Sequence, residues 1–394
     1  MPVKSIKDLD IKGKRVFFRF DFNVPLDSAG IVKDATRITR ALPTLEYAIS
    51  QGARCILASH LGRPKGERKP EMSLRPVARK LEELLGKKVT FVDDCIGPEV
   101  EQAVGAMKDG DVLFLENLRF HAEETKNDPG FSAKLASLAD VYVNDAFGTA
   151  HRAHCSTVGV PELVTEKGAG LLMKEELDNL EKALSNPVSP VLAIFGGAKV
   201  SDKIEVLNNI VNRMDVILIG GGMANTFLVS QGVSMGASRV ETDMVQTAKD
   251  IMEAASRKGA RVLLPVDVVT SSSIEDESSP KLVDVKEVPA DQMALDIGPR
   301  TVNEFETEIQ KAGTIVWNGP MGVFESEAFK KGTMAIAKAV ANSKAFSVVG
   351  GGDSVRAVMQ AGISDRISYI STGGGAFMEF MEGKTLPGVS ALEV

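Results

Sequence analysis

Short apolar runs recur along the chain, each followed by a polar or glycine-rich turn and then by a stretch with helical periodicity. The runs are continuous rather than alternating, which is typical of parallel strands covered on both faces. They lie at residues 16–20, 55–59, 112–115 and 141–143 in the first half, and at 191–195, 216–219, 262–264, 315–317, 347–349 and 369–370 in the second. The pattern predicts an α/β protein built from strand–helix–strand crossovers.

A long amphipathic stretch, "GAGLLMKEELDNLEKAL" at 168–184, separates the two series of runs, and its apolar residues share one helical face. A chain of 394 residues also has the length of two ordinary domains. We therefore expect two lobes, each a mainly parallel sheet flanked by helices, joined by a long interdomain helix. The expected bounds are 1–170 for the N-terminal domain, 171–184 for the helix and 185–375 for the C-terminal domain.

Local signals predict helix ends and loops. Ser73 is a typical N-cap and Gly86 a typical C-terminal stop for the helical pattern between them. The polar segment "TSSSIEDESSPK", 270–281, indicates a surface loop without a chemical role.

Composition excludes several classes of protein. The net charge of -7 disfavours binding to nucleic acid or to an anionic membrane, so a basic site has to be a local concentration of charge. No apolar stretch approaches the roughly 20 residues needed to cross a bilayer, and the N-terminus has no signal-like apolar region, which favours a cytoplasmic protein. Cys55, Cys95 and Cys155 show no CxxC spacing, which argues against a disulfide framework and against a thiolate zinc site.

Basic side chains follow the expected strands of the first half. Because the carboxyl ends of parallel strands meet at one edge of a sheet, the connections there should form one rim. The arginines in these connections are Arg37, Arg63, Arg119 and Arg152, with His60 and His151 nearby. Any one of these arginines alone is better interpreted as half of a surface ion pair. Together they predict a site for a compact polyanion, such as a small phosphorylated carboxylic acid.

Asp21 and Asn23 belong to the same rim. Since Asp21 would repel an anion, it either accepts a hydrogen bond from a substrate hydroxyl or pairs with one of the arginines.

Glycine-rich turns follow the strands of the second half, in "FGGAKVSDK", "IGGGMAN", "WNGPMGVFE", "VGGGDS" and "ISTGGGA". Such turns let backbone amides approach phosphate oxygens. Neither a GxxxxGK[ST] nor a GxGxxG pattern is present, which removes the P-loop class and disfavours a dinucleotide-dependent oxidoreductase. Lys199 and Lys203, four apart at an expected helix start, either reach one phosphate chain or are solvated surface lysines. Asp353 is a candidate Mg2+ ligand, an N-cap, or both.

Taken together, these motifs resemble the phosphoglycerate kinase family over the whole chain. The resemblance is carried by "RFDFNVP", "SHLGRP", "ENLRF", "VNDAFGTAHRAH", "GGAKVSDK", "WNGPMGVFE", "GGGDS", "STGGGA" and "LPG", in the order of the family. It implies two Rossmann-like lobes, a C-terminal tail (376–394) that packs back on the N-terminal lobe, and a monomer that closes like a hinge. It also implies an enzyme that moves a phosphoryl group between 1,3-bisphosphoglycerate and Mg-ADP, giving 3-phosphoglycerate and Mg-ATP.

The resemblance also assigns site residues, position by position. The acidic substrate would contact Asp21, Phe22, Asn23, Arg37, His60, Leu61, Gly62, Arg63, Arg119 and Arg152. The nucleotide with its Mg2+ would contact Lys199, Lys203, Glu325 at the ribose, Gly351, Gly352, Asp353 as the metal ligand, and Ser354.

Our hypothesis for catalysis is that Arg37, Lys199 and the amides of 373–375, including Gly374 and Gly375, contact the transferring phosphoryl group. The nucleophile in the direction from ATP is a carboxylate, so no catalytic base is required. Closure would bend the chain near 168–184 and 371–376 and exclude water. The alternative is a non-catalytic, two-lobe anion-binding protein, against which the glycine-rich turns and the absence of a signal-like N-terminus argue.

Overall fold

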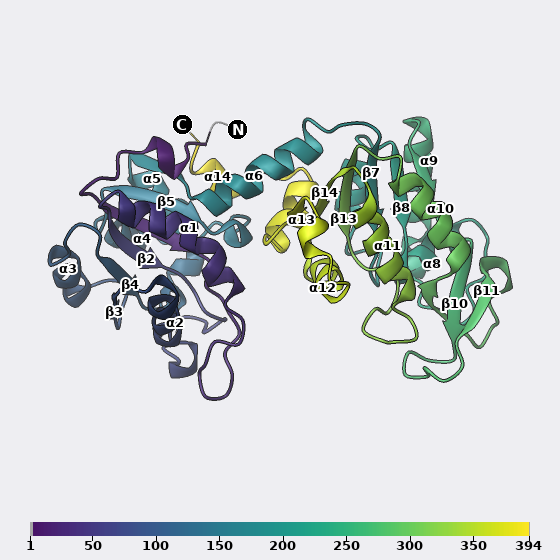
Figure 1. Ribbon diagram of the computed structural model, residues 1–394, viewed down its shortest axis with the longest axis horizontal. Coiled ribbons are helices and arrows are strands. Elements are labelled where there is room, and N and C mark those ends of the chain that lie inside the picture. Colours follow the sequence, from purple (N-terminus) through teal and green to yellow (C-terminus); the bar gives the residue numbers. More distant parts are fainter. Residues whose placement is uncertain (1–2, 394) are drawn as a thin grey trace. The chain divides into compact units, whose positions relative to one another are not determined.

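The computed structural model describes residues 3–393, and the chain divides into two compact units. Unit 1 comprises the residues up to Leu177 together with those from Thr385 onward, and unit 2 comprises Asp178–Lys384. The division falls inside helix α6 (Leu171–Leu184). Figure 1 shows the elements of each unit in sequence colours.

Unit 1 is built on a parallel sheet with strand order β3-β4-β2-β1-β5-β6. Its strands are β1 (Arg15–Phe20), β2 (Arg54–Ala58), β3 (Val89–Val92), β4 (Val112–Leu115), β5 (Val141–Asp145) and β6 (Glu166–Ala169). The helices are α1 (Thr36–Ser50), α2 (Arg75–Leu85), α3 (Pro98–Gly105), α4 (Pro129–Ala136), α5 (Val160–Leu163) and α14 (Pro387–Ser390), with the first half of α6. The chain leaves β1 toward β2 on one side and later returns to β5 on the other.

The two faces of β1 carry different side chains. Phe18 and Phe20 belong to the hydrophobic core that α1 and α2 complete with residues such as Leu45 and Leu81. Arg19 points to the opposite face because side chains alternate along a strand, and it is fully buried there.

Unit 2 contains a second parallel sheet, of order β15-β14-β13-β7-β8-β9. Its strands are β7 (Val191–Phe195), β8 (Val216–Ile219), β9 (Arg261–Leu263), β13 (Thr314–Asn318), β14 (Phe346–Val349) and β15 (Tyr369–Ile370). The helices are α7 (Ile204–Ile210), α8 (Gly221–Ser230), α9 (Val245–Arg257), α10 (Pro299–Ile309), α11 (Lys331–Asn342), α12 (Gly352–Gln360) and α13 (Gly375–Met381). Phe305 of α10, Ile336 of α11 and Val358 of α12 pack in one core with Trp317 of β13.

The predicted α/β class with two mainly parallel sheets is confirmed, but unit 2 also holds an antiparallel sheet that the sequence did not indicate. It is formed by β10 (Asp267–Ser271), β11 (Lys281–Asp284) and β12 (Met293–Ile297). The polar segment 270–281 connects two of its strands, so it is a hairpin connection rather than an isolated loop.

Several expected boundaries shift. The helix after Ser73 begins at Arg75, with Leu74 at its N-cap, although the Ser73 hydroxyl accepts a hydrogen bond from the Arg75 N–H at 3.2 Å. Gly86 ends this helix in the left-handed conformation, as predicted. The interdomain helix α6 keeps its expected bounds, Leu171–Leu184, and the residues just before it form strand β6.

The C-terminal tail is shared between the units. Helix α13 packs on α7, with the Asn209 side chain donating to the Met381 carbonyl at 2.7 Å, and it therefore belongs to unit 2. The part that joins unit 1 begins at Thr385, not at 376. There the Gly388 N–H donates to the Ala150 carbonyl at 2.8 Å.

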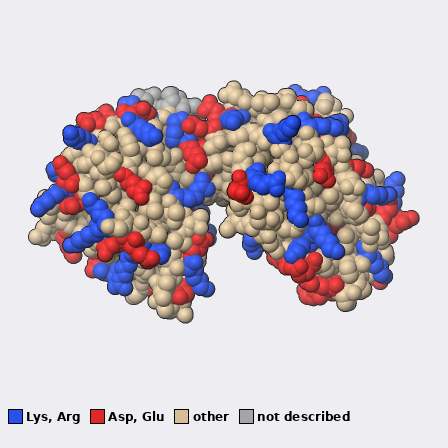
Figure 2. Space-filling view, viewed as in Figure 1, with Lys and Arg blue, Asp and Glu red and all other residues tan. Residues whose placement is uncertain are grey.

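Acidic and basic side chains are interspersed over the face of the molecule shown in Figure 2. Within residues 3–393, no helix is both long enough and apolar enough to cross a membrane.

Candidate active site

The turn after β2 is held by side chains from two neighbouring strand ends. Asn23, after β1, accepts a hydrogen bond from the Gly62 N–H at 2.9 Å. Asn117, after β4, donates to the Leu61 carbonyl at 2.8 Å. Arg119 donates to the Gly62 carbonyl at 2.9 Å. Hydrogen bonds thus connect the strand ends at the carboxyl edge of the sheet without a bound ligand.

A cavity of about 300 Å³ opens at this edge, lined by Arg63, Lys65, Gly66, Arg119, Thr125, Arg152 and His154. In the part of the chain that the structure describes, none of its arginines lies within ion-pair distance of a carboxylate. Arg152 instead donates to His151 at 3.1 Å. Lys65 is exposed and also lines this cavity.

Arg119 has buried hydrogen-bond donors that lack an acceptor. It is only 5% exposed, and its Nε and one terminal nitrogen are buried without a hydrogen-bond partner. Burial lowers its pKa to about 10, and the nearby Arg19 and Arg152 charges add to this effect. Buried donors without acceptors are costly, so an anion in the cavity would relieve this arrangement.

His60 is also buried and is surrounded by positive charge. Burial lowers its pKa well below the ordinary value, and Arg19, Arg119, Arg37 and Arg152 lower it further, so the ring is neutral near pH 7. The Arg19 guanidinium lies 3.2 Å from His60 Nδ1. Since a guanidinium can only donate, Nδ1 is the acceptor and Nε2 carries the proton. His60 can therefore donate a hydrogen bond through Nε2.

Sequence reasoning missed Arg19, which is fully buried inside β1. Its Nε donates to the Ser156 hydroxyl at 2.8 Å, and that hydroxyl donates to Glu124 at 2.6 Å. The buried Glu124 carboxylate thus balances the arginine through Ser156. The available signal was a charged residue inside an otherwise apolar strand.

Asp21 pairs with Arg37 at 2.6 Å. This is the second of the two roles expected from the sequence, and the Asp21 side chain is 15% exposed whereas that of Arg37 is 42% exposed. The other Asp21 oxygen lies 4.0 Å from His60 Nδ1. The pair keeps Arg37 at the rim with much of its surface accessible.

Two of the residues assigned to the substrate by resemblance are buried in the core. Phe22 is 1% exposed and its ring stacks on Phe20, with centroids 5.0 Å apart. Leu61 is 5% exposed and belongs to the same core. Their side chains shape the strand ends, which leaves only their backbone groups for a ligand. Arg63, by contrast, is exposed.

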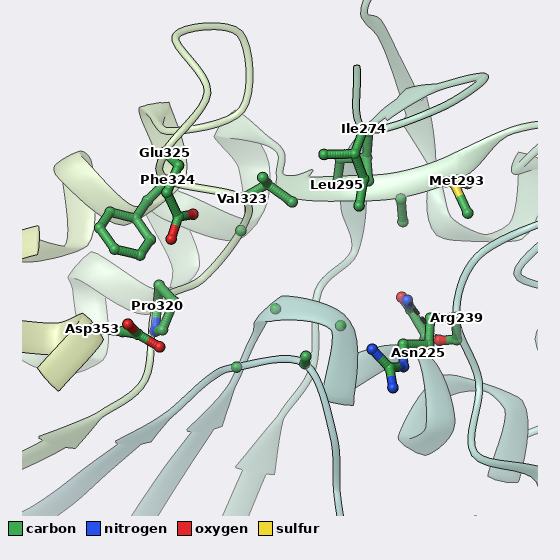
Figure 3. A pocket seen from close by; sticks show the side chains of 16 residues that line it. Asn225, Arg239, Ile274, Met293, Leu295, Pro320, Val323, Phe324, Glu325 and Asp353 are labelled. Carbon is green, nitrogen blue, oxygen red and sulfur yellow. Dashed lines mark hydrogen bonds between the residues drawn. The ribbon is translucent and has the colours of Figure 1, made fainter. Parts of the chain in front are cut away.

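Unit 2 has a cavity of about 270 Å³ at the carboxyl ends of its strands. Glycines after β7 and β8 form its floor, and Leu295, Val323, Phe324, Met293 and Ile274 form an apolar wall. Figure 3 shows Glu325 and Asp353 at one end and Asn225 with Arg239 at the other. Ile274 comes from the segment 270–281, which we had expected to have no chemical role.

The carboxylates at this cavity share one arginine. Arg356 donates to Glu325 at 2.7 Å and to Asp353 at 2.9 Å, and its guanidinium lies 4.8 Å from the centre of the Phe324 ring. Both carboxylates are more than half exposed, at 54% and 65%. Carboxylate oxygens in an open position suit Mg2+, so Asp353 fits the assigned role of metal ligand. It is not an N-cap, because Gly351 holds that position in α12.

Gly351 requires its glycine. Its φ is +89°, and a Cβ there would lie 2.4 Å from the Asn318 side chain. Ser354 is 1% exposed and accepts a hydrogen bond from the Gly319 N–H at 2.6 Å. Ser354 therefore holds the turn after β13, while Gly352 opens helix α12 beside it.

The two lysines do not share a helix face as expected. Helix α7 begins at Ile204, so Lys203 is its N-cap and Lys199 lies in the preceding turn. Lys203 donates to Asn318, and burial lowers its pKa. Lys199 is partly exposed. A short turn can still direct both toward a phosphate chain, but not through helical spacing.

The last glycine turn precedes α13. Gly374 has a φ of +51°, a Cβ placed there would meet no atom within 4 Å, and Gly375 begins the helix. The Ser371 hydroxyl accepts from the Gly373 N–H at 3.1 Å. The turn thus has open space in front of it.

Comparison with known proteins supplies the family. The phosphoglycerate kinase family model matches residues 6–384. The chain is 57% identical to the phosphoglycerate kinase of Koribacter versatilis, over 100% of this chain and 99% of that protein, and 56% identical to that of Moorella thermoacetica over the same shares. The structure resembles that of phosphoglycerate kinase from Coxiella burnetii, with a TM-score of 0.93 and 42% identity over 99% of both chains. The chain belongs to the phosphoglycerate kinase family.

Proposed function

We propose that the chain transfers a phosphoryl group reversibly between 1,3-bisphosphoglycerate and Mg-ADP, giving 3-phosphoglycerate and Mg-ATP. The observation that carries the proposal is the cavity of Arg63, Arg119 and Arg152, whose charges have no carboxylate partner among the described residues. A compact phosphorylated acid supplies the acceptors that these arginines lack. The family, whose members are phosphotransferases, supports the same reaction.

In our proposal the phosphate of 3-phosphoglycerate occupies that cavity, where Arg119 has two nitrogens without a partner. The rest of the substrate extends toward Asp21, Asn23, Arg37 and His60. His60 donates through Nε2, because Arg19 occupies its Nδ1. The turn at Leu61 and Gly62, like the backbone at Phe22, holds these groups at fixed distances.

The nucleotide occupies the cavity of unit 2. Its base packs against the apolar wall near Leu295 and Val323, and Glu325 accepts a hydrogen bond from the ribose. Lys199 and Lys203, with the amides of Gly351, Gly352 and Ser354, face the phosphates. Asp353 holds the Mg2+ that accompanies ATP or ADP as substrate, and this ion offsets the charge of the nucleotide phosphates.

The transfer step needs positioning and charge compensation more than proton transfer. The attacking group is already a carboxylate, so the site requires no base. Arg37, Lys199 and the amides near Gly374 and Gly375 compensate the charge of the moving phosphoryl group. The Asp21 pairing holds Arg37 in position for this role.

Since the two ligands are assigned to different units, we propose that turnover requires closure by bending near α6 and near residues 371–376, which excludes water from the acyl phosphate. We also place the enzyme in the cytoplasm as a monomer that acts on neither nucleic acid nor membranes. A scattering profile that stays unchanged on adding both ligands would contradict the closure.

The central test is a coupled assay for phosphorylation of 3-phosphoglycerate by ATP, with and without Mg2+. We expect turnover only when acid, nucleotide and metal are all present. Binding of 3-phosphoglycerate without any turnover would favour the alternative, a two-lobe anion-binding protein.

A further inference from the structure

A cluster of metal-ligating side chains lies beside, but outside, the basic cavity of unit 1. Asp94 and Cys95 follow strand β3, and His121 follows the turn after β4. One ligand atom from each residue lies within 4.8 Å of the others. The proposed reaction uses none of these residues.

The three side chains offer the donor set of a zinc site. Carboxylate oxygen, thiolate sulfur and imidazole nitrogen bind Zn2+ at about 2.0–2.3 Å, which places tetrahedral ligand atoms roughly 3.3–3.7 Å apart. His121 Nε2 and Asp94 Oδ1 are 2.7 Å apart as hydrogen-bond partners, so they need to separate by less than about 1 Å to share an ion. A pair of ligand atoms at the 4.8 Å limit of the cluster has to approach by about 1.1–1.5 Å, so ion binding requires side-chain rotation.

The Cys95 thiol is buried in this cluster and has no hydrogen-bond partner outside it among the described residues. It is 1% exposed and, within the described part of the chain, donates to no other residue, whereas Cys55 and Cys155 donate to backbone carbonyls. The side chains of His121 and Asp94 are 26% and 41% exposed. The cluster therefore has one buried ligand and an accessible side from which an ion and a water molecule can enter.

The surrounding charges favour a cation. The carboxylates of Asp94, Glu124 and Glu116 lie close enough to act electrostatically on Cys95. Three carboxylates around one buried sulfur attract a divalent cation, for which thiolate sulfur is a ligand. Arg68 opposes this attraction, since its charge acts on Asp94.

The two glutamates are not ligands themselves. Glu116 accepts from the Leu74 N–H at 2.8 Å and from the Ser73 hydroxyl at 2.6 Å. Glu124 accepts from Ser156 through both oxygens. Both oxygens of each glutamate accept hydrogen bonds, whereas Asp94 accepts from the Cys95 N–H and pairs with His121 through Oδ1 alone. The glutamates therefore contribute negative potential around a site with three protein ligands.

We propose that Asp94, Cys95 and His121 form a binding site for Zn2+, with water as the fourth ligand. A bound ion joins the β3–α3 connection to the segment that carries Arg119, two residues before His121. This revises the interpretation of the cysteine spacing, because the ligands come from separate segments and only the fold brings them together.

Binding of the metal alone tests the proposal. The full-length, metal-stripped protein is titrated with Co2+ without nucleotide, and the near-ultraviolet band of a cobalt–thiolate bond is recorded. We expect the band to saturate at one Co2+ per chain and to disappear when Zn2+ is added. We also expect Zn2+ to raise the thermal midpoint, since it binds the folded state.

Variants identify the ligands. Cys95→Ser should lose the cobalt–thiolate band. His121→Gln and Asp94→Asn each remove a direct ligand, so they should weaken Zn2+ binding by at least the roughly 10–100-fold that loss of a ligand's hydrogen-bond partner costs. Cys55→Ala is the matched control, a buried cysteine in β2 whose loss should leave the band unchanged. Retained phosphoryl transfer without added Zn2+ shows that each variant is folded. Absence of the band in the wild-type protein, or its persistence in Cys95→Ser, would overturn the proposal.

Discussion

The cavities of the two units have similar volumes, about 300 and about 270 Å³, but opposite linings. In unit 1 the lining is mainly basic, and Arg119 is fixed there by a hydrogen bond to the Gly62 carbonyl. In unit 2 it is glycine and apolar side chains, and its carboxylates are more than half exposed.

The difference teaches how each unit can recognise its ligand. In unit 1, Arg19 and Arg119 are already buried and are held by hydrogen bonds, so loss of one member of this network should affect the others. Unit 2 relies on shape and on glycine turns, with its charged groups at the margin. Substitutions in the charged network should therefore have large effects in unit 1, whereas substitution of an exposed, already paired carboxylate at the cavity of unit 2, such as Glu325, should have a small effect.

The largest effect is expected for Arg37→Ala. If this arginine compensates the charge of the moving phosphoryl group, its loss should lower kcat by about 10³-fold or more, as for arginine fingers. Steady-state kinetics in both directions would measure it. Arg54→Ala is the control, because Arg54 forms a similar exposed pair with Asp109 at 2.9 Å but lies at the start of β2. A turnover rate within about threefold of wild type would refute the role.

Arg19→Met tests whether unit 1 acts as a network. A hydrogen bond to a charged group contributes about 1.5–3 kcal/mol, so we expect kcat/KM for 3-phosphoglycerate to fall by about 10–100-fold. The decisive readout is nitrogen NMR of His60, whose proton should no longer be restricted to Nε2. An unchanged Nε2–H tautomer would contradict the positioning role.

The same substitution leaves Glu124 buried without its counter-charge, which costs about 3–5 kcal/mol of stability. The double variant Arg19→Met, Glu124→Gln should recover much of the unfolding free energy without recovering the His60 tautomer. This pair of variants separates stability from positioning.

The histidine part of the acid response should come from unit 1, because all 4 histidines of the chain lie there. Burial lowers the pKa of His154 from 6.5 to about 3, helped by Arg119, Arg19 and Arg152. Below pH 6.5 the unfolded chain therefore binds a proton that the folded chain does not, and the unfolding free energy falls as the pH falls. At pH 5 this contribution is about 2 kcal/mol.

Denaturant unfolding between pH 7 and pH 5 measures this loss, and His154→Gln should reduce its size by that amount. The comparison uses the slope with pH, so a constant loss of stability in the variant does not matter. Parallel curves for variant and wild type would contradict the linkage.

The sequence predicted the strands whose apolar runs are continuous, such as Val112–Leu115 and Val191–Phe195. It did not indicate Glu166–Ala169, because that edge strand is defined by pairing with β5 rather than by its own side chains. The antiparallel sheet was not predicted either, because the polar segment 270–281, which connects two of its strands, has the composition of a surface loop.

The candidate site shows the same division. Residues in long strand-end motifs, such as Arg119, could be found because topology sends those ends to one edge. Arg19 could not be found in this way, because it lies inside an apolar strand and its partners, Ser156 and Glu124, are distant in sequence. The sequence spacing also placed Lys199 and Lys203 at the start of a helix, but that helix begins at Ile204, after both of them.

The smallest effect is expected in unit 2, for Glu325→Gln. This carboxylate is 54% exposed and already paired with Arg356. If it accepts a hydrogen bond from the ribose, as we propose, its replacement removes one contact worth about 1 kcal/mol. We expect KM for ATP to rise about fivefold with little change in kcat, because the contact is the same in the ground and transition states. Glu327→Gln is the control, since Glu327 is exposed and paired with Lys330 but does not line the cavity. If turnover instead fell by roughly 100-fold or more, on the scale of about 3 kcal/mol, unit 2 would also depend on preorganised charge, and the contrast between the units would fail.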